Sequence, residues 1–207
     1  MSKISFVYFD VGGVVLLDYS GTNKWEEMKQ GLGITPELDS QFEEIWRQYR
    51  GEICLDRDVE TLVPIFREKL GLAIPANYSM IQDFVNRYDP NPTIWPLIQV
   101  LHRTTRIGLL TNMYPGLLDT IYARGDLMEL INWNVVVDSS LVKAQKPDKK
   151  IFEIAESKVD CPPGEILFVE NQQRHLDGAK QLGWQTFLYD SSRPAESSQT
   201  LANFLQL

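Results

Sequence analysis

The sequence predicts an α/β protein in which a parallel five-stranded sheet is interrupted, after its first strand, by an all-helical insert. Short runs of β-branched and aromatic residues alternate with stretches whose apolar residues recur every three or four positions. One long stretch, residues 18–90, shows only the helical spacing. The 207-residue chain, 43% of it hydrophobic, is long enough for one core, made of residues 1–17 and 91–207, with this insert.

The first predicted strand, residues 4–9, is an apolar run that ends at Asp10. Open parallel sheets bind their ligands at the carboxyl ends of the strands, which is where this carboxylate is expected. Gly12 and Gly13 allow the backbone to turn sharply and to present amides and carbonyls toward whatever lies against Asp10. Asp10 can therefore serve as a nucleophile or a metal ligand, or it can accept hydrogen bonds from its own turn.

The insert should contain about four short amphipathic helices, because aromatic and aliphatic residues recur in it at helical spacing. We expect the aromatic side chains on these helices to pack in the core of the insert rather than to contact a ligand. Residues 89–92 (DPNP) should return the chain to the main sheet.

The remaining strands are expected at residues 106–110, 133–138, 165–169 and 184–189. Helices are expected at residues 93–102, 116–130, 151–155 and 175–182 and after residue 194, on both faces of the sheet. Three strands are followed by polar residues, namely Thr111 and Asn112, then Lys146 in a loop fixed by the next proline, then Glu170 and Asn171.

These polar residues should meet around Asp10, because the carboxyl ends of parallel strands share one edge. Such a group suits phosphoryl transfer: Asp10 attacks phosphorus, Thr111 and backbone amides hold the phosphate oxygens, and Lys146 stabilises the developing charge. A hard divalent cation fits between Asp10 and the Glu170–Asn171 pair.

The order of these residues resembles the haloacid dehalogenase (HAD) superfamily, and most of all its small sugar-phosphate phosphatases with a helical cap after the first strand. The matching pieces are residues 9–15 (FDVGGVV), 110–112 (LTN), 146–148 (KPD) and 168–171 (FVEN), with Gly178 and Gly183 beyond them. The resemblance implies a Rossmann-like core and a cap that opens and closes over the site.

The resemblance also assigns roles. Asp10 would form an aspartyl-phosphate, Thr111 would bind phosphate through its hydroxyl, and Lys146 would stabilise charge. The phosphate-binding set would be Gly12, Gly13, Thr111, Asn112 and Lys146. Mg²⁺ would be the cofactor, and its ligands would be Asp10, the Gly12 carbonyl, Glu170 and Asn171.

Two positions depart from the family pattern. The phosphatases usually carry, two residues after the nucleophile, a second aspartate that acts as general acid and base, where this chain has Gly12. Such catalysis is worth about 10² to 10⁴ in rate, so the enzyme should be slow or limited to good leaving groups unless another residue, such as His175, substitutes. Asn171 replaces a usual acidic metal ligand, so metal affinity should be reduced unless Glu170 compensates.

Three functions therefore stay open. The first is a Mg²⁺-dependent phosphatase acting on a small phosphorylated, sugar phosphate-like metabolite. The second is a binding protein that kept the fold and lost the chemistry, as the residues at positions 12 and 171 suggest. The third is a metal-free hydrolase of the dehalogenase kind, because the dehalogenases of the superfamily also lack the second aspartate and the metal.

Composition excludes some partners. The formal charge of −8 argues against nucleic acid and anionic membranes, which require basic surfaces. No apolar run is long enough to span a bilayer and the first residues lack the pattern of a signal peptide, so we expect a cytoplasmic protein. Cys54 and Cys161 lie far apart without metal-type spacing, and we expect them to be reduced.

Overall fold

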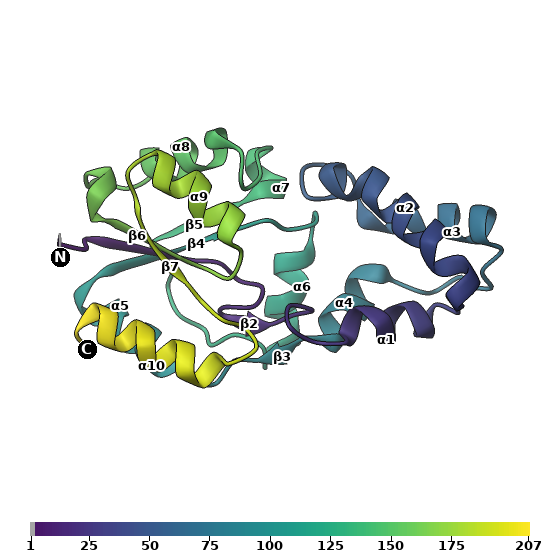
Figure 1. Cartoon of the computed structure of the whole chain (residues 1–207), viewed down its shortest axis with the longest axis horizontal. Coiled ribbons are helices and arrows are strands. Elements are labelled where there is room, and N and C mark those ends of the chain that lie inside the picture. Colours follow the sequence, from purple (N-terminus) through teal and green to yellow (C-terminus); the bar gives the residue numbers. More distant parts are fainter. Residues whose placement is uncertain (1–2) are drawn as a thin grey trace.

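The computed structural model describes residues 3–207 and has a central sheet of five parallel strands (Figure 1). The strands are β1 (Phe6–Phe9), β4 (Arg106–Thr111), β5 (Val135–Asp138), β6 (Ile166–Glu170) and β7 (Gln185–Leu188), in the spatial order β5-β4-β1-β6-β7. The predicted five-stranded parallel sheet is confirmed, and β1, which ends at the predicted nucleophile, is its central strand.

Helices cover both faces of this sheet. Figure 1 shows α8 (Lys149–Ser157) and α9 (Gln173–Gln181) on one face, and α5 (Trp95–Thr104) and α10 (Pro194–Leu205) on the other. Along β1, Phe6 and Tyr8 belong to one buried hydrophobic cluster and Val7 and Phe9 to the other. Successive side chains of a strand point to opposite faces, so this continuous apolar run fits a strand that is buried on both sides.

The regular elements between residues 24 and 87 are all helical, as the sequence predicts for the insert. It contains α1 (Lys24–Gly31), α2 (Pro36–Ile53), the short 3-10 helix η1 (Val59–Thr61), α3 (Leu62–Leu70) and α4 (Met80–Arg87). These helices lie beyond one edge of the sheet (Figure 1). The chain enters and leaves the insert through β2 (Leu16–Leu17) and β3 (Asp89–Pro90), which pair antiparallel. The domain bounds given above, with a cap of residues 18–90, stay a prediction.

Some helix bounds differ from those expected. The helix predicted over residues 116–130 is α6 (Leu117–Arg124), which ends because Gly125 adopts a left-handed conformation with φ of 80°. The predicted loop after β5 contains a short helix, α7 (Ser139–Val142), whose first turn is capped by the Asp138 carboxylate. A second 3-10 helix, η2 (Pro163–Glu165), precedes β6.

The segment after β5 also holds the insert against the core. Three of its side chains donate hydrogen bonds to carbonyl groups at the C-terminal end of α2, where a helix leaves carbonyls unpaired. These bonds are Ser139 Oγ to Cys54 O at 2.6 Å, Lys143 Nζ to Leu55 O at 3.0 Å and Gln145 Nε2 to Gly51 O at 3.0 Å. The end of α2 is therefore fixed directly beside the predicted catalytic residue Lys146.

Two further predictions, on the cysteines and on membrane-spanning helices, can be compared with the structure. Cys54 and Cys161 are both free thiols, as predicted. Among residues 3–207, no helix combines the length and the apolar character needed to cross a membrane.

Candidate active site

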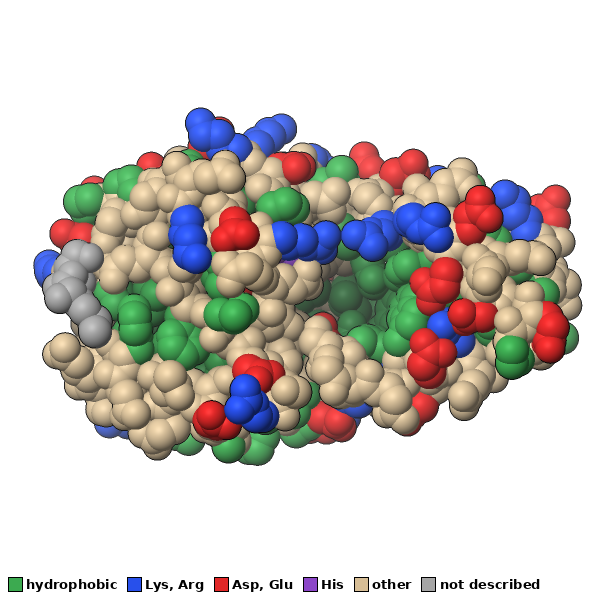
Figure 2. All heavy atoms as spheres, viewed as in Figure 1, with side chains coloured by type: hydrophobic (Ala, Val, Ile, Leu, Met, Phe, Trp, Pro, Cys, Tyr) green, Lys and Arg blue, Asp and Glu red, His purple; other side chains and the backbone are tan. Residues whose placement is uncertain are grey.

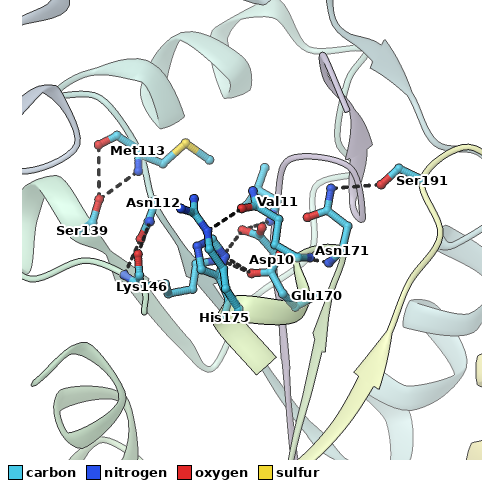
Figure 3. Close-up of polar contacts among 12 residues, drawn as sticks. Asp10, Val11, Asn112, Met113, Ser139, Lys146, Glu170, Asn171, His175 and Ser191 are labelled. Atoms are coloured by element: carbon cyan, nitrogen blue, oxygen red, sulfur yellow. Dashed lines mark hydrogen bonds and ion pairs between the residues drawn. The ribbon is translucent and has the colours of Figure 1, made fainter. Parts of the chain in front are cut away.

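The structure brings Asp10, Lys146 and Glu170 together at the carboxyl edge of the sheet (Figure 3). Lys146 Nζ lies 2.9 Å from Asp10 Oδ1 and 2.6 Å from Glu170 Oε2. The three side chains come from the end of β1, the loop before α8 and the end of β6. The lysine and the glutamate are fully buried, and only 9% of the Asp10 side chain is exposed.

The two oxygens of Asp10 are in different environments. Oδ1 accepts hydrogen bonds from the Val11 amide at 2.8 Å and from Lys146. Oδ2 accepts no hydrogen bond from any residue of the described range 3–207. Burial and the charge of Glu170 raise the pKa of Asp10 to about 6, while Lys146 opposes them. One oxygen is thus fixed and the other is free to react.

Glu170 is saturated with hydrogen bonds. Its Oε1 accepts from the amides of Asn171 and Gln172 at 2.9 and 3.0 Å, and its Oε2 accepts from Lys146 and from His175 Nδ1 at 2.9 Å. We expected Glu170 to be a metal ligand; in this structure each of its oxygens already accepts two hydrogen bonds, and metal binding by Glu170 stays a prediction. Its carboxylate anchors the ammonium group of Lys146.

Lys146 is also fixed through its backbone. Asn112 Nδ2 donates to the Lys146 carbonyl at 2.9 Å, and Asn112 Oδ1 accepts from the Lys146 amide at 2.8 Å. Although burial alone disfavours the ammonium, the carboxylates of Asp10 and Glu170 raise the pKa of Lys146 above its ordinary value. Asn112, expected to bind phosphate, therefore uses both ends of its amide to position Lys146.

Thr111 and Gly13 have distinct surroundings. Thr111 is buried at the end of β4 and lines the cavity over Asp10. The Gly13 amide donates to the Leu16 carbonyl at 2.8 Å, which removes it from the expected phosphate-binding set. Gly13 has a φ of 75°, and a Cβ there would lie 2.1 Å from Asn171 Nδ2, so only glycine fits.

A further carboxylate, which the sequence analysis missed, lies beside Gly12. A Cβ on Gly12 would be 2.5 Å from Asp18 Oδ2, so the aspartate occupies the space that a larger residue at position 12 would need. The other oxygen, Oδ1, accepts from the Ser20 amide at 2.8 Å. Burial raises the pKa of Asp18. The signal in the sequence is a lone acidic residue directly after the apolar residues 14–17.

These residues form the floor of a cavity of about 440 Å³ between the core and the insert. Figure 2 shows the hollow, with hydrophobic side chains inside it. The core contributes Asp10, Gly12, Thr111, Asn112 and Lys146, and the insert contributes several of the aromatic side chains that we expected to serve only as packing. The cavity is of the size that small-molecule sites usually have.

A model of the haloacid dehalogenase-like hydrolase family matches residues 4–183. The chain is a member of this family. Bifunctional epoxide hydrolase 2 from Sus scrofa is 25% identical over 199 residues, 87% of this chain and 35% of that protein, so the chain spans about a third of this relative. The (S)-2-haloacid dehalogenase of Pseudomonas sp. strain YL is 24% identical over 199 residues, 90% of this chain and 82% of that one.

The fold is shared with solved structures of the family. A HAD family enzyme from Bacteroides thetaiotaomicron, in complex with magnesium and inorganic phosphate, aligns with a TM-score of 0.70 at 16% identity. The alignment covers 91% of this chain and 95% of that one. At this identity the likeness concerns the fold.

The residues of this HAD-like hydrolase fit a hard cation such as Mg²⁺. Asn171 Nδ2 donates to Ser191 Oγ at 3.0 Å, and this bond orients Asn171 Oδ1, which is buried and has no partner within the described residues. Asp10 supplies the charged oxygen. No group of three or more His, Cys, Asp or Glu side chains in residues 3–207 is arranged to hold a metal. Mg²⁺ does not need one, because it commonly binds one or two carboxylates together with waters and substrate phosphate.

His175 does not replace the missing acid or base of this HAD-like hydrolase. It is buried, it contributes to the lining of the cavity, and its Nδ1 donates to Glu170. Burial, reinforced by the Lys146 charge, lowers the pKa of His175 to about 3. The imidazole is therefore neutral near pH 7 and helps to orient Glu170.

Proposed function

We propose that the chain is a Mg²⁺-dependent phosphatase that hydrolyses a small phosphorylated metabolite through an aspartyl-phosphate at Asp10. The observation that carries this proposal is the pairing of Lys146 with Asp10 Oδ1, which leaves Oδ2 free at the floor of the cavity. The enzyme from Bacteroides thetaiotaomicron, which shares the fold and was solved with magnesium and inorganic phosphate, supports it.

In the first step, Asp10 Oδ2 attacks phosphorus and the bond from phosphorus to the ester oxygen breaks. The departing oxygen takes a proton and leaves as an alcohol. In the second step, water attacks the aspartyl-phosphate, which returns the carboxylate and releases inorganic phosphate. Mg²⁺, held by Asp10 and Asn171 with the Gly12 carbonyl, would neutralise negative charge on the phosphoryl group.

The polar floor of the cavity supplies the remaining contacts. Lys146 fixes the nucleophile and offers positive charge to the phosphoryl oxygens, and Thr111 offers a hydroxyl. The Gly12 amide makes no hydrogen bond within residues 3–207 and is available as a further donor.

We assign proton transfer to Asp18. Its Oδ2 lies against Gly12 and its side chain lines the same cavity as Asp10. A carboxyl group from position 18 would then serve in the space where the family's phosphatases usually have the carboxylate of the second aspartate, which offsets the departure at Gly12. The raised pKa supports the role, because the group holds a proton more readily than an exposed aspartate.

The test is turnover of p-nitrophenyl phosphate with Mg²⁺ by the wild type, by Asp10→Asn and by the exposed control Asp126→Asn. We expect Asp10→Asn to lose at least about 10³-fold in kcat, because no oxygen nucleophile remains, and the control to keep full activity. Turnover by Asp10→Asn at the wild-type rate would overturn the proposal. Phosphate binding without turnover by the wild type would favour the hypothesis of a binding protein that kept the fold and lost the chemistry.

Metal-free dehalogenation is the second candidate, because the chain resembles an (S)-2-haloacid dehalogenase over most of the length of both proteins. Asp10 Oδ2 would then attack carbon and displace a halide ion. Halide release from a 2-haloacid in the presence of a chelator, with no phosphate release, would replace the first candidate by this one. We further propose a cytoplasmic location and no nucleic-acid or membrane partner, supported by the charge of −8.

A further inference from the structure

The cavity over Asp10 has two chemically different parts. Its floor is the polar edge of the sheet, and its walls are largely aromatic. The aromatic wall, as we call it, consists of Tyr19, Trp25, Trp46, Phe84, Tyr88 and Tyr114. All but the last come from the insert or the segment leading into it.

The aromatic wall is a connected assembly. The Trp46 ring centroid lies 4.9 Å from that of Trp25 and 6.3 Å from that of Tyr114, and Phe84 lies 5.7 Å from Tyr19 and 5.4 Å from Tyr114. Most of these pairs meet edge to face, which holds each ring in a defined orientation. The wall is thus a preformed aromatic surface in the same cavity as the reactive carboxylate.

Among the side-chain polar atoms of the wall, Trp25 Nε1 is bonded to the protein itself. Trp25 Nε1 donates to Glu43 Oε1 at 2.7 Å, and the same oxygen accepts from Lys29 Nζ at 3.1 Å. Within the described residues, the Tyr19 hydroxyl is buried and has no partner. Trp46 Nε1 and the hydroxyls of Tyr88 and Tyr114 also have no protein partner there, so the wall offers several hydrogen bonds to a ligand.

Two arginines line the cavity in addition to Lys146 on its floor. Arg50 of the insert and Arg174 of α9 both contribute to the lining. Figure 2 shows basic side chains along one rim, above an apolar interior. On a chain with a charge of −8, these arginines favour the approach of an anionic substrate and do not select its uncharged part.

We infer that the substrate is the phosphate monoester of an aromatic alcohol that carries polar substituents. The inference rests on the proposed phosphatase function and names its substrate class. The phosphate meets Asp10, Thr111 and Lys146, and the aromatic group fills the cavity against the aromatic wall. A cavity of about 440 Å³ accommodates a phosphate with a small ring system.

The test compares two esters whose leaving groups are similar, so that they differ only in the group that would contact the aromatic wall. Phenethyl phosphate and a hexose phosphate esterified at its primary alcohol are both alkyl esters. We expect kcat/KM of the wild type with Mg²⁺ to be at least about 10²-fold higher for phenethyl phosphate, since a single methylene in an apolar pocket is worth about 10- to 200-fold. Equal values, or a preference for the hexose ester, would overturn the inference.

Two matched variants test whether the aromatic wall causes the preference for phenethyl phosphate. Trp46→Leu removes an indole from the aromatic wall, whereas Trp133→Leu removes one that packs against Phe9 and Trp95. The first should raise KM for phenethyl phosphate at least about 10-fold and leave the hexose ester little changed, and the second should keep the wild-type ratio. A ratio unchanged in a folded Trp46→Leu would contradict the inference.

The same experiments separate the two proposals. Failure of the wild type to hydrolyse p-nitrophenyl phosphate and both alkyl esters would remove the phosphatase function itself. Hydrolysis of p-nitrophenyl phosphate that depends on Asp10, without the aromatic preference, would leave that function standing and overturn only the substrate class.

Discussion

The carboxylate of Asp18 lies against the bare Cα of Gly12, so that a Cβ at position 12 would be only 2.5 Å from Asp18 Oδ2. The absence of a side chain at Gly12 leaves a space, and the carboxylate of Asp18 occupies that space. A chain with both a larger residue at position 12 and this conformation of Asp18 would not fit.

Asp18→Asn should slow the hydrolysis of poor leaving groups selectively. We expect a loss of about 10²-fold in kcat for phenethyl phosphate and less than about 10-fold for p-nitrophenyl phosphate, because p-nitrophenolate leaves without a proton. The measurement is kcat for both esters at one pH. An equal loss for both would indicate a structural role only.

The double variant Gly12→Asp/Asp18→Gly provides the control for this prediction. It removes the carboxylate from position 18 and returns one from position 12 into the vacated space. Recovery of phenethyl phosphate hydrolysis, relative to Asp18→Gly alone, is the expected result, and the absence of any recovery would count against proton transfer from this place.

Glu170→Gln should destabilise the protein, because it leaves the buried Lys146 with one carboxylate fewer. Breaking a buried ion pair by removing one partner typically costs about 3 to 5 kcal/mol. Glu153→Gln is the matched control, since Glu153 pairs with Lys149 on the surface and exposed pairs contribute about 1 kcal/mol or less. Urea denaturation of the three proteins gives the comparison, and equal losses in the two variants would refute the anchoring role of Glu170.

Asn171→Asp should strengthen Mg²⁺ binding. The oxygen of Asn171 that lacks a partner would become part of a charged carboxylate next to Asp10, and hard cations prefer charged oxygens. We expect the Kd for Mg²⁺, measured by calorimetry without substrate, to fall about 10-fold. An unchanged Kd would show that position 171 does not contact the ion.

Gly13→Ala should cost much more stability than Gly71→Ala. Both glycines have a positive φ, so both substitutions bear the left-handed backbone penalty of about 1 to 2 kcal/mol. The new Cβ at position 71 meets nothing within 4 Å, whereas at position 13 it would lie 2.1 Å from Asn171 Nδ2. The difference in free energy of unfolding between the two variants therefore measures the close packing at the site, and similar values would deny it.

The sheet and the meeting of Asp10, Lys146 and Glu170 could be predicted from the sequence because parallel strands impose them. Each strand is a short apolar run with a polar end, and the edge they share is a property of the topology. The end of α6 was mispredicted because Leu127, Met128 and Leu130 continue the helical spacing, although Gly125 is a recognisable helix terminator.

The direction of individual side chains could not be predicted. Helical spacing shows that Trp46 and Phe84 lie on an apolar face, and it does not tell whether that face meets another helix or a cavity. The bonds that saturate Glu170, the burial of His175 and the approach of Asp18 to Gly12 all join segments that are distant or sharply turned. Such contacts depend on the packed structure.

The segment that carries Lys146 also binds the end of α2 through hydrogen bonds from Ser139, Lys143 and Gln145. Any displacement of the insert from the core would have to break these three bonds within a few residues of Lys146. The ammonium group itself is held by Asp10 and Glu170 of the core, so a displacement of the insert would strain the backbone before Lys146 and leave the charge beside the nucleophile.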